Sequence, residues 1–433
     1  MTAIREINAR RVWDSRGNPT IEVEVALENG KLGRAIAPAG ASRGMREAID
    51  LRDGGNHLRG MDVQKALHHL NHQIAPEFVG KNIEDQAGLD QLLLQLDPSP
   101  LKSKLGGNAM VATSLAFLHA SAVNLDQPLW QRVSQLYGRT PSLPLPEIQI
   151  FGGGAHAGRR VDIQDFMVMV PGAKSFDEVM EITNEIYFAA GDLMKAKGQL
   201  AGVADEGGWW PNFDSNEEAL ETLVRAIEKA GEKPGDRVVI SLDVAASEFG
   251  KDGQYNLALE DRDLSSAQLI ELLGQWIADY PIASIEDPLG EDDPEGMIEF
   301  TNRFGSKVQI IGDDFLVTNA KLVKDAQQMS ACNAVLIKVN QAGTVSEAIA
   351  AFEAASQQNW RSIVSARSGE TEDVSISHLA VGLGAGQLKV GSFTRSERMA
   401  KWNEVLRIQD QLGADAFVQG APLHNTFWAQ KGQ

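Results

Sequence analysis

Cysteine is almost absent from this chain, since Cys332 is the only one in 433 residues. A single cysteine excludes an internal disulfide and is typical of a protein from a reducing compartment. Long hydrophobic runs are also missing, because no segment reaches the roughly 18 consecutive apolar residues of a transmembrane helix. The first twenty residues, which begin MTAIREINAR, lack the apolar core of a secretory signal. We therefore expect a cytoplasmic protein with no membrane partner.

Positive charge is scarce relative to negative charge. The chain has 40 Lys and Arg residues against 59 Asp and Glu residues, a formal net charge of −19. Binding to a phosphate backbone requires a basic surface, so we do not expect nucleic acid as a partner. Most of these acids should simply favour solubility, but a cluster of them would attract a hard cation such as Mg²⁺.

The phosphate loops of nucleotide-binding folds are also missing, because neither G-x-G-x-x-G nor G-x-x-x-x-G-K-S/T follows a predicted strand. Instead, alternating apolar and polar positions up to about residue 30 predict two strands joined by a turn at 15–19. Helical periodicity then continues to about residue 124, which indicates an α+β domain over 1–135. From a proline-rich stretch at 140–147 onward, strand-like runs alternate with amphipathic helices. This pattern favours a (β/α)8-type barrel over 136–433.

A series of charged residues is the most informative feature of the second domain. Each one ends an apolar run, and successive members lie roughly 20 to 45 residues apart, the spacing of strand-plus-helix units. The series consists of Asp243, Glu286, Asp313, Lys338, Arg367 and Lys389. Because catalytic groups of such barrels lie at the carboxyl ends of the strands, we expect these side chains to converge on one mouth.

The residue types in this series indicate a metal-assisted reaction on an anionic substrate. Asp243, Glu286 and Asp313 would offer only oxygen ligands, which select a hard cation such as Mg²⁺. Taken singly, each acid could equally be a surface residue or a helix N-cap. Lys338 beside metal ions should have a depressed pKa, because positive charge and burial both disfavour the ammonium, and it could then act as a general base. The alternative is a lysine that only pairs with a neighbouring carboxylate.

Anion-binding and acidic groups complete the predicted mouth. Arg367 and Ser368 offer a cationic fork beside a hydroxyl, a suitable phosphate clamp, and Lys389 adds a second fixed positive charge. His156 follows a run of glycines, where a histidine is more often structural than catalytic. Asp205 and Glu206 lie in an acidic, glycine-rich turn, and spacing alone does not decide whether either is a general acid.

Long ordered segments of the chain resemble the enolases, the Mg²⁺-dependent 2-phosphoglycerate hydro-lyases of glycolysis. The matching segments are DSRGNPTIEVEV, GGAHAG, ADEGG, LDVAASEF, SIEDP, GDDFLVTN, IKVNQAGT, RSGETED and RSERMAKWNEVLRI. The resemblance implies an N-terminal α+β capping domain on an eight-stranded barrel with one irregular early strand connection. It also implies a homodimer or homo-octamer and two Mg²⁺ ions per active site, one of them bound with higher affinity.

The resemblance also implies a role for each site residue. Asp243, Glu286 and Asp313 would hold the higher-affinity Mg²⁺, and Ser42 in the first loop would meet the second. Lys338 would remove the α-proton, and Glu206 would assist departure of the β-hydroxyl. The remaining substrate-binding residues would be Lys389 at the substrate carboxylate, Arg367 and Ser368 at the phosphate, and His156, Gln164 and Asp165 along the pocket.

Several positions depart from the pattern of familiar enolases. The first loop reads Ala39-Gly40-Ala41-Ser42-Arg43-Gly44 in place of S-G-A-S-T-G. A family histidine is Ala366, a family glutamate is shortened to Asp165, a family asparagine is Gly152, and an aromatic-alanine pair is Trp209-Trp210. We predict that all of these lie in or beside the pocket.

Three functions remain open at this point. The first is dehydration of 2-phosphoglycerate to phosphoenolpyruvate. The second is the same α-proton abstraction on a related phosphorylated or phosphonate carboxylate, with Arg43 and Arg46 as an additional anion site. The third is a binding or structural protein on an enolase scaffold, which the intact set of charged residues disfavours.

Overall fold

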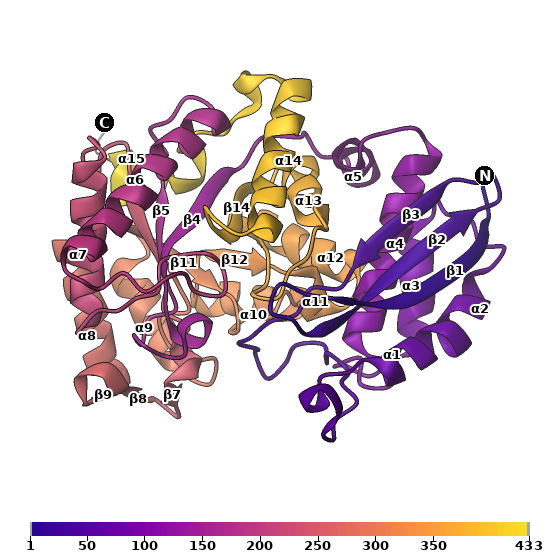
Figure 1. The fold of residues 1–433 in the computed structure, drawn as a ribbon, viewed down its shortest axis with the longest axis horizontal. Helices are drawn as coiled ribbons and strands as arrows, with labels where there is room; N and C mark the ends of the chain where they lie inside the picture. The colour runs from indigo at the N-terminus through magenta and orange to yellow at the C-terminus, as the bar shows by residue number, and fades with distance from the viewer. Residues whose placement is uncertain (1, 431–433) are drawn as a thin grey trace.

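The computed structural model describes residues 2–430. An N-terminal domain forms one end of the molecule and a closed barrel forms the other (Figure 1). The N-terminal sheet is antiparallel, in the order β1 (Ile4–Trp13), β2 (Pro19–Leu27), β3 (Leu32–Ile36). The predicted turn at 15–19 joins the first two strands, as expected.

Short helices and one long helix complete this domain. They are α1 (Gln64–His69), α2 (Ala75–Phe78), α3 (Gln86–Leu96), α4 (Gly107–Asn124) and α5 (Leu129–Tyr137). Helix α4 packs against β2 and β3 and is buried on nearly every side. Its small residues permit this, since Gly33 lies so close that an added Cβ would be 2.1 Å from the backbone nitrogen of Ala120. A helix that is apolar all round is expected in such a central position.

Eight strands close into the barrel in the order β10-β11-β12-β13-β14-β4-β5-β6, which confirms the predicted barrel. Their bounds are β4 (Leu145–Gly152), β5 (Asp165–Met169), β6 (Val239–Asp243), β10 (Ile282–Glu286), β11 (Gln309–Gly312), β12 (Ala334–Ile337), β13 (Arg361–Ser365) and β14 (Gly386–Ser392). The surrounding helices are α6 (Phe176–Ala196), α7 (Asn216–Lys229), α8 (Ser266–Asp279), α9 (Pro294–Phe304), α10 (Ala320–Met329), α11 (Val339–Ala342), α12 (Val345–Ser356), α13 (Ser375–Leu383), α14 (Ser396–Leu412) and α15 (Phe427–Gln430).

One strand runs against the other seven. β5 pairs antiparallel with both β4 and β6. It follows β4 without an α-helix between them, and two consecutive helices, α6 and α7, then precede β6. This is the irregular early strand connection that the resemblance implies. The predicted alternation of single strands with single helices is wrong at this point. Because β5 is reversed, its first residue lies at the mouth: Asp165 is in register with Gly152 and Asp243, the last residues of β4 and β6.

Several helices begin at a serine or threonine that caps them. Ser215, Ser265 and Thr344 each cap a helix by accepting the backbone N–H of the third helical residue. Only Ser265 forms the complete reciprocal box, with Gln268 bonding back.

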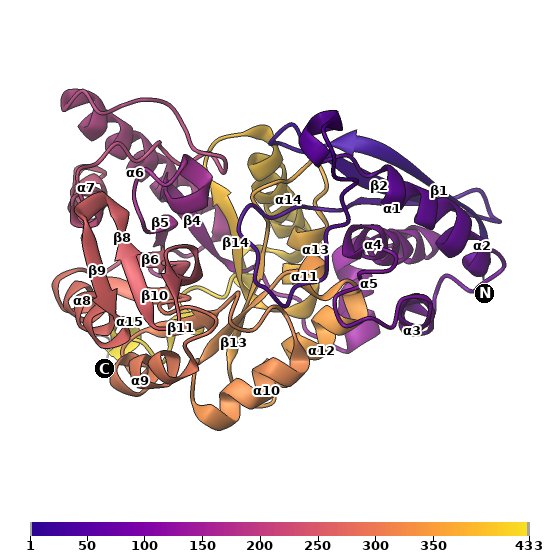
Figure 2. The same cartoon turned by 90° about the horizontal axis from the view of Figure 1, so that it is seen from below.

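Two further segments bear on the site. A small antiparallel sheet, β7 (Gly250–Lys251), β8 (Gln254–Leu257) and β9 (Arg262–Ser265), lies on the side of the barrel away from the N-terminal domain (Figure 2). The loop between β3 and α1 crosses from the N-terminal domain to the barrel, where Ala48 donates its N–H to the carbonyl of Gln341 at 2.8 Å. Among the described residues, no helix combines the length and apolarity needed to cross a bilayer.

Candidate active site

Most of the predicted charged residues lie at or just beyond the carboxyl end of a strand. Asp243 and Glu286 are the last residues of β6 and β10 and stand opposite each other in register. Asp313 and Lys338 directly follow β11 and β12, and Arg367 lies two residues beyond β13. The parallel strands therefore bring these side chains to one mouth, and all of them are buried.

Lys389 is the exception, because it lies in the middle of β14 and not at its end. The strand continues for three residues beyond it, so the prediction of a strand-ending position is wrong. The long side chain still reaches the mouth: its Nζ lies 2.7 Å from Asp243 Oδ2, 2.8 Å from Glu286 Oε2 and 3.4 Å from Asp165 Oδ2. One buried ammonium thus bridges three carboxylates, which offsets the cost of burying the charges.

Lys338 is paired with an acid. Its Nζ donates to Asp313 Oδ2 in a close ion pair. Burial alone lowers the pKa of Lys338, but the carboxylates of Asp313 and Glu286 together outweigh it and raise the pKa above the usual lysine value. The depressed pKa expected from the sequence was that of a lysine beside bound metal ions, whereas this raised pKa reflects the protein's own groups alone. Among the protein's own groups Lys338 is an ammonium, as in the alternative of a lysine paired with a carboxylate.

Several buried oxygens at the mouth have no hydrogen-bond donor among the described groups. They are Asp243 Oδ1, Glu286 Oε1, Gln164 Oε1 and Asp165 Oδ2. Gln164 directs its Nε2 to Asp243 Oδ2 at 3.0 Å, which leaves its own carbonyl oxygen free. A buried oxygen that accepts no hydrogen bond is costly. A group of such oxygens can instead serve as the oxygen-only ligands of a hard cation. These residues therefore suit Mg²⁺.

Among the described residues, two clusters bring possible ligand atoms within 4.8 Å of one another, and neither is the predicted set of Asp243, Glu286 and Asp313. The clusters are His156 with Asp165 and Glu206, and Asp287 with Asp313 and Asp314. In the second cluster, Asp287 accepts the backbone N–H groups of Asp313 (2.9 Å) and Asp314 (2.7 Å). Burial raises the pKa values of Asp287 and Asp314 well above the usual range, with a further contribution from the charge of Asp313. We attribute to Asp287 a structural role in shaping the turn that presents Asp313.

The side of the site that holds Arg367 and Ser368 is closed by the first loop. Arg367 bonds Glu47 through Nη1 at 2.9 Å and the carbonyl of Ser42 through Nη2 at 2.9 Å. Ser368 Oγ accepts the N–H of Ala41 at 2.6 Å. At Gly40 an added Cβ would lie 2.0 Å from Arg367 Nη2, so only glycine permits this close approach. Arg43, by contrast, is exposed and is not among the residues that line the cavity.

Sequence reasoning missed the groups that hold this side together. Glu47 receives Arg367, and Gln341 Nε2 links Glu47 (3.2 Å) to Asp313 Oδ1 (2.8 Å). From α14, Arg398 and Lys401 are fully buried and hold the backbone that follows β13. Their bonds reach the carbonyls of Arg367 (2.6 Å), Ser368 (2.5 Å) and Thr371 (2.7 Å). Their only sequence signal was their place within the matching segment RSERMAKWNEVLRI.

The acidic side of the site lies around the start of β5, four strands round the eight-stranded barrel from β12, which Lys338 follows. His156 Nδ1 lies 3.1 Å from Asp165 Oδ1, and its Nε2 lies 3.8 Å from Glu206 Oε1. Burial lowers the pKa of His156, but the charges of Glu206 and Asp165 outweigh it and raise the pKa to about 9. The imidazole is therefore a cation at neutral pH, held between two carboxylates.

This charge state predicts a pH dependence of stability. The pKa of His156 rises from about 6.5 in the unfolded chain to about 9 in the fold. The folded state then binds more protons, so the contribution of His156 is complete below about pH 6.5 and is lost as pH rises through about 9. We expect Tm to fall between pH 7 and pH 10 by more in the wild type than in His156→Gln. Equal declines in the two proteins would contradict a charged His156.

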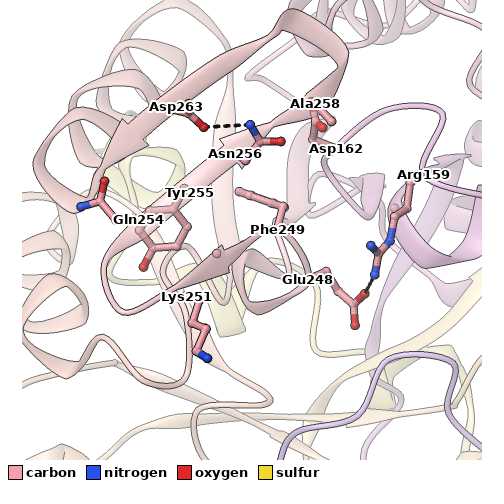
Figure 3. A pocket seen from close by; sticks show the side chains of 12 residues that line it. Arg159, Asp162, Glu248, Phe249, Lys251, Gln254, Tyr255, Asn256, Ala258 and Asp263 are labelled. Atoms are coloured by element: carbon pink, nitrogen blue, oxygen red, sulfur yellow. Dashed lines mark hydrogen bonds and ion pairs between the residues drawn. The ribbon is translucent and has the colours of Figure 1, made fainter.

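The cavity at the mouth is small, at ≈ 20 Å³, and is lined by most of the predicted residues together with Gly40, Ala41, Ser365, Ala366 and Val390. Glu286, Asp313 and Arg43 are not among its lining residues. A much larger cavity of ≈ 670 Å³ lies beside β7 and β8 and the outer end of the His156 loop (Figure 3). Its charged groups include the Arg159–Glu248 pair at 2.9 Å, which is exposed at the arginine. We place the chemistry at the small cavity, because the buried charges and open oxygens are there.

The departures divide into two groups. Ala366 and Asp165 line the cavity, and Gly152 adjoins it through Gln149. Trp209 does not line the cavity: it stacks on Tyr187 with ring centres 4.7 Å apart and donates its Nε1 to the carbonyl of Tyr187 at 2.8 Å. Trp210 lies near Gly158 at the outer part of the His156 loop. The tryptophans thus pack behind the acidic turn, not inside the pocket.

Comparison with known families agrees with this architecture. A family model described as the N-terminal domain of enolase matches residues 4–133. A second, described as the C-terminal TIM barrel domain of enolase, matches residues 140–426. The two matches follow one another along nearly the whole chain and meet at the connection between α5 and β4. The chain therefore belongs to the enolase family and is an enolase-like lyase.

Proposed function

We propose that the chain dehydrates 2-phosphoglycerate to phosphoenolpyruvate in a Mg²⁺-dependent reaction. The observation that supports this most directly is a single cavity lined by both a lysine and a carboxylic acid, Lys338 and Glu206. Lys338 follows β12 and pairs with Asp313, whereas Glu206 lies beside His156 near the start of β5, four strands round the barrel from β12. Removal of a proton and departure of a hydroxide from neighbouring carbons require such an arrangement.

The residues divide the work as follows. The proton α to a carboxylate is weakly acidic, so its removal by Lys338 requires stabilisation of a dianion. Lys389, a fixed cation within the mouth, would contact the substrate carboxylate. Mg²⁺ on Asp243, Glu286 and Asp313, when bound, would supply further positive charge where the dianion develops. Use of a lysine base with Mg²⁺ in this superfamily is a known pattern and not a result of this structure.

The other groups bind the phosphate and complete the elimination. Arg367 keeps unused N–H donors besides those given to Glu47 and Ser42, and Ser368 adds a hydroxyl. Glu206 would protonate the departing hydroxide, with His156 and Asp165 beside it. For Lys338 to accept a proton it must first lose its own, and a cation on Asp313 would favour that by weakening the ion pair. We further propose that the active protein is a homodimer or homo-octamer.

A specialised homologue remains the second candidate, supported by Ala366 and Asp165 in the cavity wall. It would abstract the α-proton of a related phosphorylated or phosphonate carboxylate. Arg43 and Arg46 have limited access to such a ligand in this structure. Arg43 is exposed outside the cavity, and Arg46 donates to the carbonyl of Phe315 at 2.9 Å.

Steady-state kinetics on 2-phosphoglycerate separates the two candidates. If the chain is an enolase, kcat/KM should lie within about 10⁴–10⁸ M⁻¹s⁻¹, the ordinary range for enzymes. Ala366→His should then be neutral or beneficial, and Arg43→Thr should have little effect because Arg43 lies outside the cavity. Poor turnover of 2-phosphoglycerate, together with tighter binding of an analogue that has an additional anionic group, would favour the specialised homologue.

A further inference from the structure

Gln149 occupies the centre of the acidic side of the site. It lies on β4, is completely buried, and has its side chain inside the barrel. Its Oε1 accepts the N–H of Gly208 at 2.9 Å, and its Nε2 donates to Asp165 Oδ1. The same Nε2 lies 3.4 Å from Glu206 Oε2. Because the backbone N–H fixes which end of the amide is the oxygen, the nitrogen must face the two carboxylates.

Two glycines make room for this amide. At Gly208 an added Cβ would lie 2.4 Å from Gln149 Oε1, and at Gly152 it would lie 3.0 Å from the same oxygen. The Gly152 Cβ would also come within 2.8 Å of the Cβ of Ala204. Gly152 is one of the departures from the family pattern. The Gln149 side chain can therefore keep its position only because residues 152 and 208 are glycines without a Cβ.

Gln149 and Asp165 are matched in length. In the antiparallel pair of β4 and β5, Gln149 is in register with Met167, so Asp165 lies two residues further along, on the same face. A glutamate at 165 would extend its oxygens by about 1.5 Å, one carbon–carbon bond, into the space of the amide. An asparagine at 149 would fall short of Asp165 by the same amount. The shortened acid and the long amide thus require each other.

We propose that Gln149 is the positioning residue of the acidic side. It would hold Asp165 toward His156 and Lys389, and hold Glu206 where it meets the departing hydroxide. The proposal rests on the proposed function and deepens it. No bond from Gln149 reaches the base, since Lys338 is held by Asp313 on the opposite side. Disturbing Gln149 should therefore impair elimination and spare α-proton removal.

The kinetic test uses the full-length protein with Mg²⁺ and 2-phosphoglycerate. In Gln149→Asn we expect kcat for elimination to fall about 10- to 100-fold, as for loss of a charged hydrogen bond. Exchange of the α-proton with D₂O should stay within about threefold of the wild type. Asp165→Glu should likewise lose elimination while it retains exchange of the α-proton. The double variant moves one methylene from one side chain to the other and should recover elimination to within about threefold.

The control is Gln387→Asn. Gln387 is an equally buried amide of the barrel interior, bonded to Glu147 at 2.7 Å and without a contact to Asp165 or Glu206. In this variant the rate of α-proton exchange and kcat for elimination should change by the same factor. If Gln149→Asn lost exchange and elimination equally, or if the double variant were no better than the single ones, the positioning role would be wrong.

A measurement without substrate keeps this inference separate from the proposed function. The ¹⁵N resonances of His156, assigned with His156→Gln, report on its bond to Asp165. They should shift in Gln149→Asn and return in the double variant, but remain in place in Gln387→Asn. If the wild type failed to act on 2-phosphoglycerate, the proposed function would be wrong. The His156 resonances would still test the positioning role of Gln149, because their measurement needs no substrate. Unchanged His156 resonances in Gln149→Asn would refute it.

Discussion

Lys338→Ala should abolish exchange of the substrate α-proton with D₂O and lower kcat by about 10⁴-fold, the upper end of what a positioned general base contributes. The side chain directly follows β12, is buried, and is the only lysine besides Lys389 among the residues that line the cavity. Lys389 cannot replace it, because its Nζ is shared among Asp243, Glu286 and Asp165.

The comparison variant is Glu206→Gln. If Glu206 acts only after the α-proton has left, this variant should retain exchange while losing elimination. Gln is nearly isosteric with Glu and keeps a carbonyl oxygen toward Gln149 Nε2, so the geometry of the acidic turn should survive. Isotope exchange followed by NMR measures both steps on one sample. Equal loss of exchange in Lys338→Ala and Glu206→Gln would contradict this division between base and acid.

The sequence predicted the barrel and most of the mouth because both follow from local patterns. A buried strand gives an apolar run, and a charged residue at its end is visible wherever the run stops. Asp243, Glu286 and Asp313 were found in this way, and parallel strands necessarily bring such ends together. The resemblance then added Gln164 and Asp165, whose position at the mouth depends on the reversed strand β5.

The remaining features depend on contacts that no local pattern reveals. The direction of β5 is not encoded in its apolar run DFMVM, which would look the same in either orientation. Lys389 lies within a strand, where a buried lysine is unexpected until its three carboxylates are seen. Gln149 and Gln341 are uncharged amides without any motif, and their importance comes from partners distant in sequence.

The pKa of Lys338 illustrates the same limit for electrostatics. The sequence indicated positive neighbours, but the sign of the shift depends on which charge is nearest in space. Asp313, 25 positions earlier in the chain, forms the ion pair and raises the pKa. Which residue holds a proton therefore follows from tertiary distances and from the ions bound, and not from the order of charged residues along the chain.

Removal of divalent metal should abolish activity, and Mg²⁺ should restore it. The physical reason is the set of buried oxygens without donors, Asp243 Oδ1, Glu286 Oε1 and Gln164 Oε1, which surround the mouth at neighbouring strand ends. Asp243→Asn keeps the shape of the side chain but removes one of these charges. Loss of one partner from a buried charge pair costs about 3–5 kcal/mol, so Mg²⁺ affinity should fall about 10²- to 10³-fold or more.

Calorimetric titration with Mg²⁺ and thermal unfolding with and without Mg²⁺ measure this effect independently of turnover. Binding to the folded state raises stability as the ratio of free Mg²⁺ to Kd increases, so the wild type should gain Tm and Asp243→Asn should gain little. Glu147→Gln is the matched control, since Glu147 is a fully buried barrel carboxylate whose oxygens already receive Ser241 (3.1 Å) and Gln387 (2.7 Å). It should bind Mg²⁺ as the wild type does. Full turnover in thoroughly demetallated protein would exclude the metal-dependent mechanism, and equal Mg²⁺ affinity in Asp243→Asn would place the ion elsewhere.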